Sequence, residues 1–336
     1  MYNQKYHKLD LTKYNFLVTG GAGFIGSNIV EYLVKYGAKK VRVLDNFSTG
    51  KEENIKTFLS QDCFELIQGD IRDLTTCNLA CEGIDYVFHQ AALGSVPRSI
   101  EDPKTTNDVN ISGFVNMLIA TKNSRVKRFI YAASSSTYGD SEALPKLENK
   151  IGKPLSPYAI TKYVNELYAD IFSSTYNIET IGLRYFNVFG QRQDPDGAYA
   201  AVIPKFIMQL MQHQSPVING DGEYSRDFTY IDNVIQINMQ CLDVINKDAI
   251  NQVYNVAFGE RTTLNELIAY LKNYLTNFDN TIHDILVDHG PIRKGDIPHS
   301  LASIKKAKSL LGYNPKYSIK EGLKEAIDWY WYNLSR

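Results

Sequence analysis

A chain of 336 residues with 44% hydrophobic and 22% charged residues has the balance of an ordinary globular protein, long enough for one large domain or two medium ones. Its formal net charge of -1 provides no basic surface for nucleic acid or for an anionic membrane, so any anion site must be built locally. No apolar run reaches the length of about 18 residues that a membrane span needs, so we expect no membrane partner.

The four cysteines do not form the pattern of a disulfide framework, and no secretory signal precedes the first predicted strand. These features predict a reducing, cytoplasmic setting. Cys77 and Cys81 stand four residues apart, but no second pair of cysteines or histidines lies at zinc spacing. We therefore expect packing cysteines and no metal.

Residues 1–14 are polar and aromatic without a clear period, which predicts an extension before the fold begins. Short apolar runs then alternate with helix-like stretches such as 27–36 and 110–121. The runs fall at residues 16–18, 41–44, 64–67, 86–89, 129–132, 180–184 and 253–256. This alternation predicts an α/β fold with βαβ units and a doubly wound parallel sheet.

From Asn187 onward the pattern loosens into loops rich in Gly, Pro and Asp, with helices between them. This change favours a second, smaller and interleaved C-terminal domain over a continuation of the sheet. We predict a dinucleotide-binding domain over residues 15–185 together with about 233–258, and a second domain over residues 186–232 and 259–336.

The first motif is Thr19-Gly20-Gly21-Ala22-Gly23-Phe24-Ile25-Gly26 at a strand-to-helix turn. Without side chains at Gly20, Gly23 and Gly26, backbone amides and the helix N-terminus can approach a pyrophosphate. Asp45 closes the second strand, where a carboxylate accepts from both ribose hydroxyls and repels a 2′-phosphate. The pair predicts NAD as the cofactor rather than NADP.

The second motif is Tyr158-Ala159-Ile160-Thr161-Lys162. On a helix, Tyr158 and Lys162 share one face and reach one pocket. A phenol with a pKa near 10 is a poor base at neutral pH, and lowering that pKa by about 3 units requires roughly 4 kcal/mol of preferential phenolate stabilisation. Lys162 and an oxidised nicotinamide ring are the cations that could supply it.

Three serines, Ser134, Ser135 and Ser136, follow the fifth predicted strand, at the edge where doubly wound sheets place their ligands. A hydroxyl there can bridge a sugar hydroxyl and the tyrosine oxygen. The spacing leaves open which of the three does so.

Over nearly all residues after the extension, the chain resembles the extended short-chain dehydrogenases/reductases, and among them the nucleotide-sugar 4-epimerases. The motifs that carry the resemblance are the glycine turn, 45–50, 89–92, the serine run, 156–162, 184–190, 219–222, 226–228 and 293–296. The resemblance implies a Rossmann sheet that binds NAD and a smaller α/β domain that binds a UDP-sugar.

Residue by residue, the resemblance implies a cofactor site made of Gly20, Gly23, Phe24, Ile25, Gly26, Asp45, Asn46, Ser48, Gly50, Asp70, Ile71, Gln90, Ala91, Ala92, Tyr158, Lys162 and Tyr185. Among these, Asp70 and Ile71 are expected near the adenine. The substrate residues that it implies are Ser95, Ser134, Ser136, Asn187, Val202, Arg226, Arg293, Asp296 and Ser300. Arginine forks suit a diphosphate buried in a nearly neutral protein.

The family's catalytic hydroxyl aligns with Ser134, and with Ser135 or Ser136 if the turn is shifted. The related 4,6-dehydratases carry Asp-Glu after that hydroxyl, whereas Ser135-Ser136 stand here, which disfavours dehydration. The implied reaction is a transient oxidation in which the Tyr158 phenolate takes the proton of the sugar 4-hydroxyl while hydride leaves carbon 4 for NAD. The 4-keto sugar then turns over and receives hydride on its other face.

Substrate choice is expected to depend on Ser300, which aligns with the family's variable gate. A tyrosine there would crowd the 2-position of the sugar, whereas serine leaves room for an N-acetyl group. The resemblance is to bacterial epimerases of UDP-N-acetylglucosamine, its galacto epimer or their uronic acids, which feed lipopolysaccharide O-antigen and capsule polysaccharide synthesis. Ser300 as an ordinary loop residue is the alternative.

The leading hypothesis is therefore reversible 4-epimerisation of a UDP-N-acetylhexosamine, UDP-GlcNAc and UDP-GalNAc or the uronic acids. A UDP-glucose or UDP-glucuronate 4-epimerase is the enzymatic alternative. An inactive Rossmann scaffold that senses NAD is the alternative of another class, and it predicts the loss of Tyr158 or Lys162, both of which are present. The resemblance also implies a homodimer formed by the helices of Asn110 and Tyr158.

Overall fold

The computed structural model describes residues 2–195, 201–292 and 297–334. Its centre is a seven-stranded sheet in the order β11-β6-β5-β4-β1-β2-β3, in which every neighbouring pair is parallel. The strands are β1 (Asn15–Thr19), β2 (Lys40–Asp45), β3 (Phe64–Gln68), β4 (Tyr86–His89), β5 (Arg128–Ser134), β6 (Thr180–Tyr185) and β11 (Gln252–Val256). The predicted doubly wound parallel sheet is confirmed.

The order of the strands reverses between β1 and β4, because β2 and β3 follow on one side of β1 while β5 and β6 follow on the other side of β4. Connections that leave in opposite directions open a crevice at the carboxyl ends of these two strands. The glycine turn follows β1 and the 89–92 motif follows β4, so both predicted cofactor motifs lie at this crevice.

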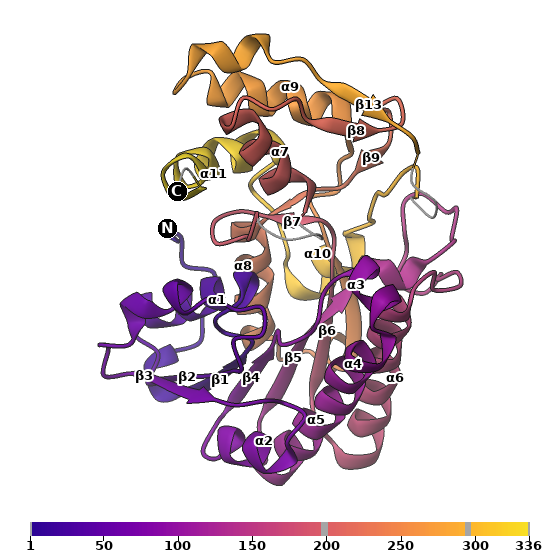
Figure 1. The fold of residues 1–336 in the computed structure, drawn as a ribbon. Helices are drawn as coiled ribbons and strands as arrows, with labels where there is room; N and C mark the ends of the chain where they lie inside the picture. Colours follow the sequence, from indigo (N-terminus) through magenta and orange to yellow (C-terminus); the bar gives the residue numbers. More distant parts are fainter. Residues whose placement is uncertain (1, 196–200, 293–296, 335–336) are drawn as a thin grey trace.

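Helices cover both faces of the sheet (Figure 1). On one side α1 packs against α8, and on the other α2, α5 and α6 lie in a row, with α4 against α6. The bounds are α1 (Phe24–Lys35), α2 (Leu74–Cys81), α3 (Val96–Glu101), α4 (Pro103–Asn107), α5 (Gly113–Asn123), α6 (Pro157–Tyr176) and α8 (Ile231–Gln240). The helix expected over 110–121 is in fact a π-helical turn over Asp108–Ser112 that continues into α5.

The second lobe stands above the carboxyl edge of the sheet in Figure 1. It contains α7 (Val202–Met211), α9 (Leu264–Leu275) and α11 (Ile319–Leu334), and the short strand pairs β8 (Val217–Asn219) with β13 (Asp288–Gly290) and β9 (Ser225–Arg226) with β12 (Thr262–Thr263). In addition, β7 (Val188–Phe189) pairs with β10 (Thr229–Tyr230), and α10 (Lys305–Leu311) packs near β11. The chain thus leaves the sheet after β6 and returns to it at β11, while the domain boundaries given above stay a prediction.

The N-terminal segment, residues 2–14, packs on the sheet domain rather than standing apart from it. Tyr2 and Tyr6 are buried, and the Tyr2 hydroxyl donates to Asn28 Oδ1 at 2.5 Å on α1. The Tyr6 hydroxyl donates to the buried Asp232 at the start of α8. The segment therefore joins α1 to α8 through side chains that belong to the main hydrophobic core.

No helix in the part of the chain that the structure describes is both long and apolar enough to cross a bilayer.

Candidate active site

One pocket lies along the carboxyl edge of the sheet, at the crevice between β1 and β4. All the residues predicted to hold the dinucleotide line it, and so do Ser134 and the Tyr158–Lys162 pair. The rest of its lining was not predicted from the sequence and consists of Leu44, Thr49, Gly69, Leu93, Gly94, Val109, Ala132 and Ala133. Leu44, Ala132 and Ala133 lie at or next to the end of a predicted strand, which is the signal that could have identified these three.

The glycine turn brings two stretches of backbone into contact. A Cβ on Gly26 would collide with the backbone carbonyl of Gly20, and one on Gly20, whose φ is +67°, would lie 2.7 Å from the Ala91 amide. Helix α1 begins after Gly23 without a side-chain cap, so its first backbone amides keep no intrahelical partner. An uncapped helix start behind a side-chain-free cradle fits the pyrophosphate of NAD.

Asp45, at the end of β2, is buried and presents its carboxylate to the same pocket. The Ala22 amide donates to one of its oxygens at 2.9 Å and the Phe47 amide to the other at 2.8 Å. Burial raises the pKa of Asp45, and these backbone hydrogen bonds oppose the rise. Each oxygen has a further lone pair, so the carboxylate can still accept from the two hydroxyls of a ribose.

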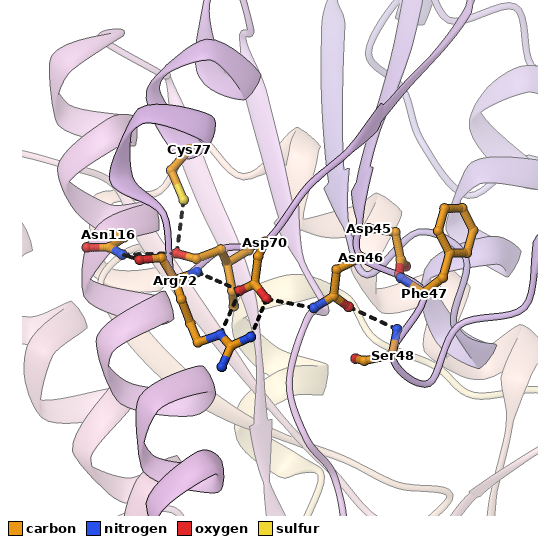
Figure 2. A network of polar contacts seen from close by, with 9 residues as sticks. Asp45, Asn46, Phe47, Ser48, Asp70, Arg72, Cys77 and Asn116 are labelled. Atoms are coloured by element: carbon orange, nitrogen blue, oxygen red, sulfur yellow. Dashed lines mark hydrogen bonds and ion pairs between the residues drawn. The ribbon is translucent and has the colours of Figure 1, made fainter.

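A chain of polar contacts continues from this point to the predicted adenine end (Figure 2). The Asn46 amide donates to Asp70 at 2.8 Å and accepts from the Ser48 amide at 3.0 Å. Arg72 forms an ion pair with Asp70 at 2.7 Å, and the hydrogen bond from Arg72 lowers the pKa of Asp70 to about 2. These contacts hold the loops after β2 and β3 in one arrangement along the pocket.

Tyr158 and Lys162 project from the first turns of α6, which Ser156 caps by accepting from the Ala159 amide at 3.1 Å. The Lys162 ammonium donates to the Ala132 carbonyl of β5 at 2.8 Å. Burial lowers the pKa of Lys162 to about 8, while Glu166 opposes this change. Burial also raises the pKa of Tyr158, and a hydrogen bond with the Ser134 hydroxyl acts in the opposite direction.

Among the three serines, it is Ser134 that lines the pocket. Its hydroxyl lies 2.8 Å from that of Ser136 and accepts from the Ser136 amide at 3.2 Å. Ser135 and Ser136 belong to a 3₁₀ turn that leads away from the strand. This geometry favours Ser134 as the hydroxyl that works with Tyr158.

The predicted substrate residues outside this group belong to several separate segments. Ser95 caps α3 by accepting from the Arg98 amide at 3.2 Å, and Val202 is the first residue of α7. Asn187 donates to the Asp227 carbonyl at 3.0 Å. None of these three lines the cofactor pocket.

Arg226 and Ser300 come together around β9. The Arg226 guanidinium donates to the Pro298 carbonyl at 3.1 Å, and the Ser300 amide donates to the Ser225 carbonyl at 3.0 Å. Arg293 and Asp296 lie outside the described residues. Two members of the predicted substrate set, 74 positions apart in the chain, are thus neighbours.

Asn110, which the sequence indicated only as part of a predicted helix, links two parts of the pocket. From the π-helical turn its side chain accepts from the Leu93 amide at 2.8 Å and donates to the Leu93 carbonyl at 3.1 Å. It also donates to the Thr161 hydroxyl at 3.1 Å. Asn110 thereby ties the loop after β4 to α6 beside Lys162.

Comparison with known proteins points to one family. The NAD dependent epimerase/dehydratase family matches residues 16–257. A UDP-N-acetylglucosamine 4-epimerase from Methanobrevibacter ruminantium M1, solved in complex with UDP-N-acetylmuramic acid, is 39% identical with a TM-score of 0.88, over 95% of this chain and 98% of that one. A UDP-glucose 4-epimerase from Thermotoga maritima, solved with UDP-glucose, is 36% identical and has a TM-score of 0.87. The match covers 96% of this chain and 100% of that one. A UDP-glucuronic acid 4-epimerase from Bacillus cereus, solved with UDP-glucuronic acid and NAD, is 31% identical and has a TM-score of 0.86. The match covers 95% of this chain and 99% of that one.

Proposed function

Because this chain belongs to the NAD dependent epimerase/dehydratase family, we propose that it interconverts UDP-N-acetylglucosamine and UDP-N-acetylgalactosamine, or the corresponding uronic acids, by 4-epimerisation. The chain is an NAD-dependent UDP-sugar 4-epimerase. The choice of an N-acetylated sugar is the part that goes beyond this coarser assignment.

The proposed reaction is supported above all by one observation, namely that Tyr158, Lys162 and Ser134 line the same dinucleotide pocket. Bound NAD supplies the hydride acceptor for oxidation and the donor for the reverse step. Tyr158 takes the proton of the sugar 4-hydroxyl and later returns it to the 4-keto oxygen. Lys162 stabilises the phenolate electrostatically, and Ser134 hydrogen-bonds both the phenol and the sugar oxygen.

The residue that supports an N-acetylated substrate is Ser300. It is half-buried, and its amide bonds to the strand that carries Arg226. With Arg226 on the diphosphate, a small side chain at position 300 leaves space at the 2-position of the sugar, whereas tyrosine would fill it. A relative described as a UDP-N-acetylglucosamine 4-epimerase adds to this support.

The test is a turnover assay without added cofactor, in which UDP-N-acetylglucosamine, UDP-glucose and their uronic acids are followed in parallel by NMR of the anomeric protons. We expect the galacto epimer to form chiefly from an N-acetylated substrate. Ser300→Tyr should shift the preference toward UDP-glucose, while Ser309→Tyr, on the exposed side of α10, should not. Preference of the wild type for UDP-glucose or UDP-glucuronate would reject the N-acetyl assignment and keep the epimerase.

We also propose a cytoplasmic homodimer that pairs α5 and α6 of each copy. Helix α6 carries a row of exposed apolar side chains, among them Ile160, Leu167 and Ile171, the last of which is 58% exposed. Positions seven and four apart lie on one helix face, so these side chains form a stripe that a second copy would cover. A place in lipopolysaccharide O-antigen or capsule synthesis, which the family resemblance implies, stays a prediction.

A further inference from the structure

A fully buried carboxylate, Asp227, lies where the second lobe meets the sheet. Its side chain is 0% exposed and accepts only backbone amides among the described contacts: Phe258 at 3.1 Å and Gly259 at 3.2 Å to Oδ1, and Gly259 and Ala302 at 3.2 Å each to Oδ2. Burial raises the pKa of Asp227 to about 7, against the effect of these amides. Burying a carboxylate is expensive, and an apolar residue would fill the same space at lower cost, so packing alone does not explain it.

The amides that Asp227 holds belong to two distant segments. Phe258 and Gly259 follow β11 of the sheet, and Gly259 has a φ of +93°, a conformation that side chains disfavour. Ala302 lies 75 positions after Asp227 in the chain, two residues beyond Ser300. One carboxylate therefore fixes a sheet-end turn and the segment that follows the predicted gate.

The same residue is connected to three of the predicted substrate residues. Arg226 is its neighbour in the chain, and the Asn187 amide donates to the Asp227 carbonyl at 3.0 Å. Ser300 in turn bonds to Ser225, next to Arg226. Asn187 and Arg226 are thus joined to Asp227 directly, and Ser300 is joined to it through Ser225, two positions earlier in the chain.

We propose that Asp227 is the positioning residue of the UDP-sugar half of the site, and that its hydrogen bonds to Gly259 and Ala302 keep Arg226 and Ser300 in the arrangement that binds substrate. The inference rests on the proposed UDP-sugar substrate. Its carboxylate is fully buried and accepts only backbone amides among the described contacts, so Asp227 acts through the segments that it holds. It acts because binding groups on separate loops recognise a ligand only when their supporting contacts hold them to within a fraction of an ångström.

The test is Asp227→Asn in the full chain with its bound NAD. The amide keeps the size of the carboxylate but replaces one acceptor by an NH₂ group that faces backbone N–H donors. We expect the KM for the UDP-sugar and the Kd of UDP, measured by calorimetry, to rise about 10- to 100-fold, which matches the loss of one buried hydrogen-bond partner. The NAD content should stay unchanged and kcat should change much less than KM.

Asp243→Asn is the matched control, because Asp243 also accepts two backbone amides, from Lys8 and Leu9, but does so at the N-terminal segment. It should leave KM and Kd unaltered. Gly259→Ala is the second variant in case Asp227→Asn does not fold, since it strains the turn that Asp227 holds without changing the carboxylate. It should raise KM in the same direction.

If Asp227→Asn, or Gly259→Ala in its place, lowers the melting temperature but binds UDP as the wild type does, Asp227 is merely structural and the inference is overturned. A wild type that binds no UDP and converts no UDP-sugar would overturn the proposed function and this inference together. If the wild type binds UDP and the variant binds it with the same Kd, this inference alone is overturned and the proposed function stands.

Discussion

Replacing Lys162 with methionine should abolish turnover and, at the same time, stabilise the fold at neutral pH. The Lys162 side chain is 3% exposed, and burial lowers its pKa from 10.5 to about 8. At about 1.4 kcal/mol for each tenfold change in the ionisation equilibrium, keeping the ammonium buried at pH 7 costs about 3 kcal/mol of folding free energy. Methionine removes this cost but loses the hydrogen bond to the Ala132 carbonyl, worth about 1 kcal/mol. The free energy of unfolding of Lys162→Met at pH 7 should therefore be about 2 kcal/mol higher than that of the wild type.

The difference in stability between Lys162→Met and the wild type should shrink as the pH rises. Below pH 8 the lysine is protonated in both the folded and the unfolded chain, so the full cost is present. Between pH 8 and 10.5 the folded wild type has released the proton while the unfolded chain still binds it, so the stability of the wild type rises with pH. The advantage of Lys162→Met should thus disappear near pH 10.

Urea unfolding of NAD-free protein at pH 7 and pH 10 measures both quantities, and the NMR assay measures turnover. Lys104→Met is the control, because the Lys104 side chain is 86% exposed and its ion pair with Asp108 lies at the surface. Its stability should stay within about 0.5 kcal/mol of the wild type. The reasoning is refuted if Lys162→Met is less stable than the wild type at pH 7, or if the difference between them is the same at both pH values.

Three further predictions concern the cofactor, the chemistry and the assembly. Tyr158→Phe should keep its bound NAD and lose about 10²- to 10⁴-fold in kcat. The absorbance of extracted nucleotide measures the NAD content, and a rate assay measures kcat. Unchanged turnover would exclude Tyr158 as the base. Gly26→Ala should be purified with little NAD, because its Cβ would meet the backbone of the turn. Gly83→Ala also strains a turn, since the φ of Gly83 is +68°, but its Cβ meets open space and Gly83 does not line the pocket, so this control should retain NAD. Equal NAD contents in the two variants would contradict the cradle. Ile171→Glu on α6 should give a monomer by light scattering, while Ile245→Glu, at a site 93% exposed, should not; a dimer that survives Ile171→Glu would place the interface elsewhere.

Short windows of sequence were enough to predict the sheet strands and the two motifs. The runs at 86–89 and 180–184 coincide with β4 and β6 to within one residue. The glycine turn lies between β1 and α1, where its spacing indicates it should. These features depend on local physics, namely side-chain periodicity, backbone freedom at glycine and the four-residue spacing on a helix face.

The sequence could not distinguish Ser134 from its two neighbours, because three hydroxyls in a row carry the same local signal. Only the end of β5 and the start of the 3₁₀ turn decide which one enters the pocket. The extension at residues 1–14 likewise showed no period, yet Tyr2 and Tyr6 are buried against α1 and α8. Its order comes from partners that lie far along the chain.

What the sequence by itself determined about this protein is therefore the class of fold, the family, the cofactor and the Tyr158–Lys162 pair, since each follows from periodicities and motifs that can be read along the chain without its tertiary contacts. The tertiary structure alone decided that β11 returns beside β6 and that Asp227 joins Gly259 to Ala302. These contacts close loops of tens of residues, and no local pattern specifies which distant amide a buried carboxylate will meet.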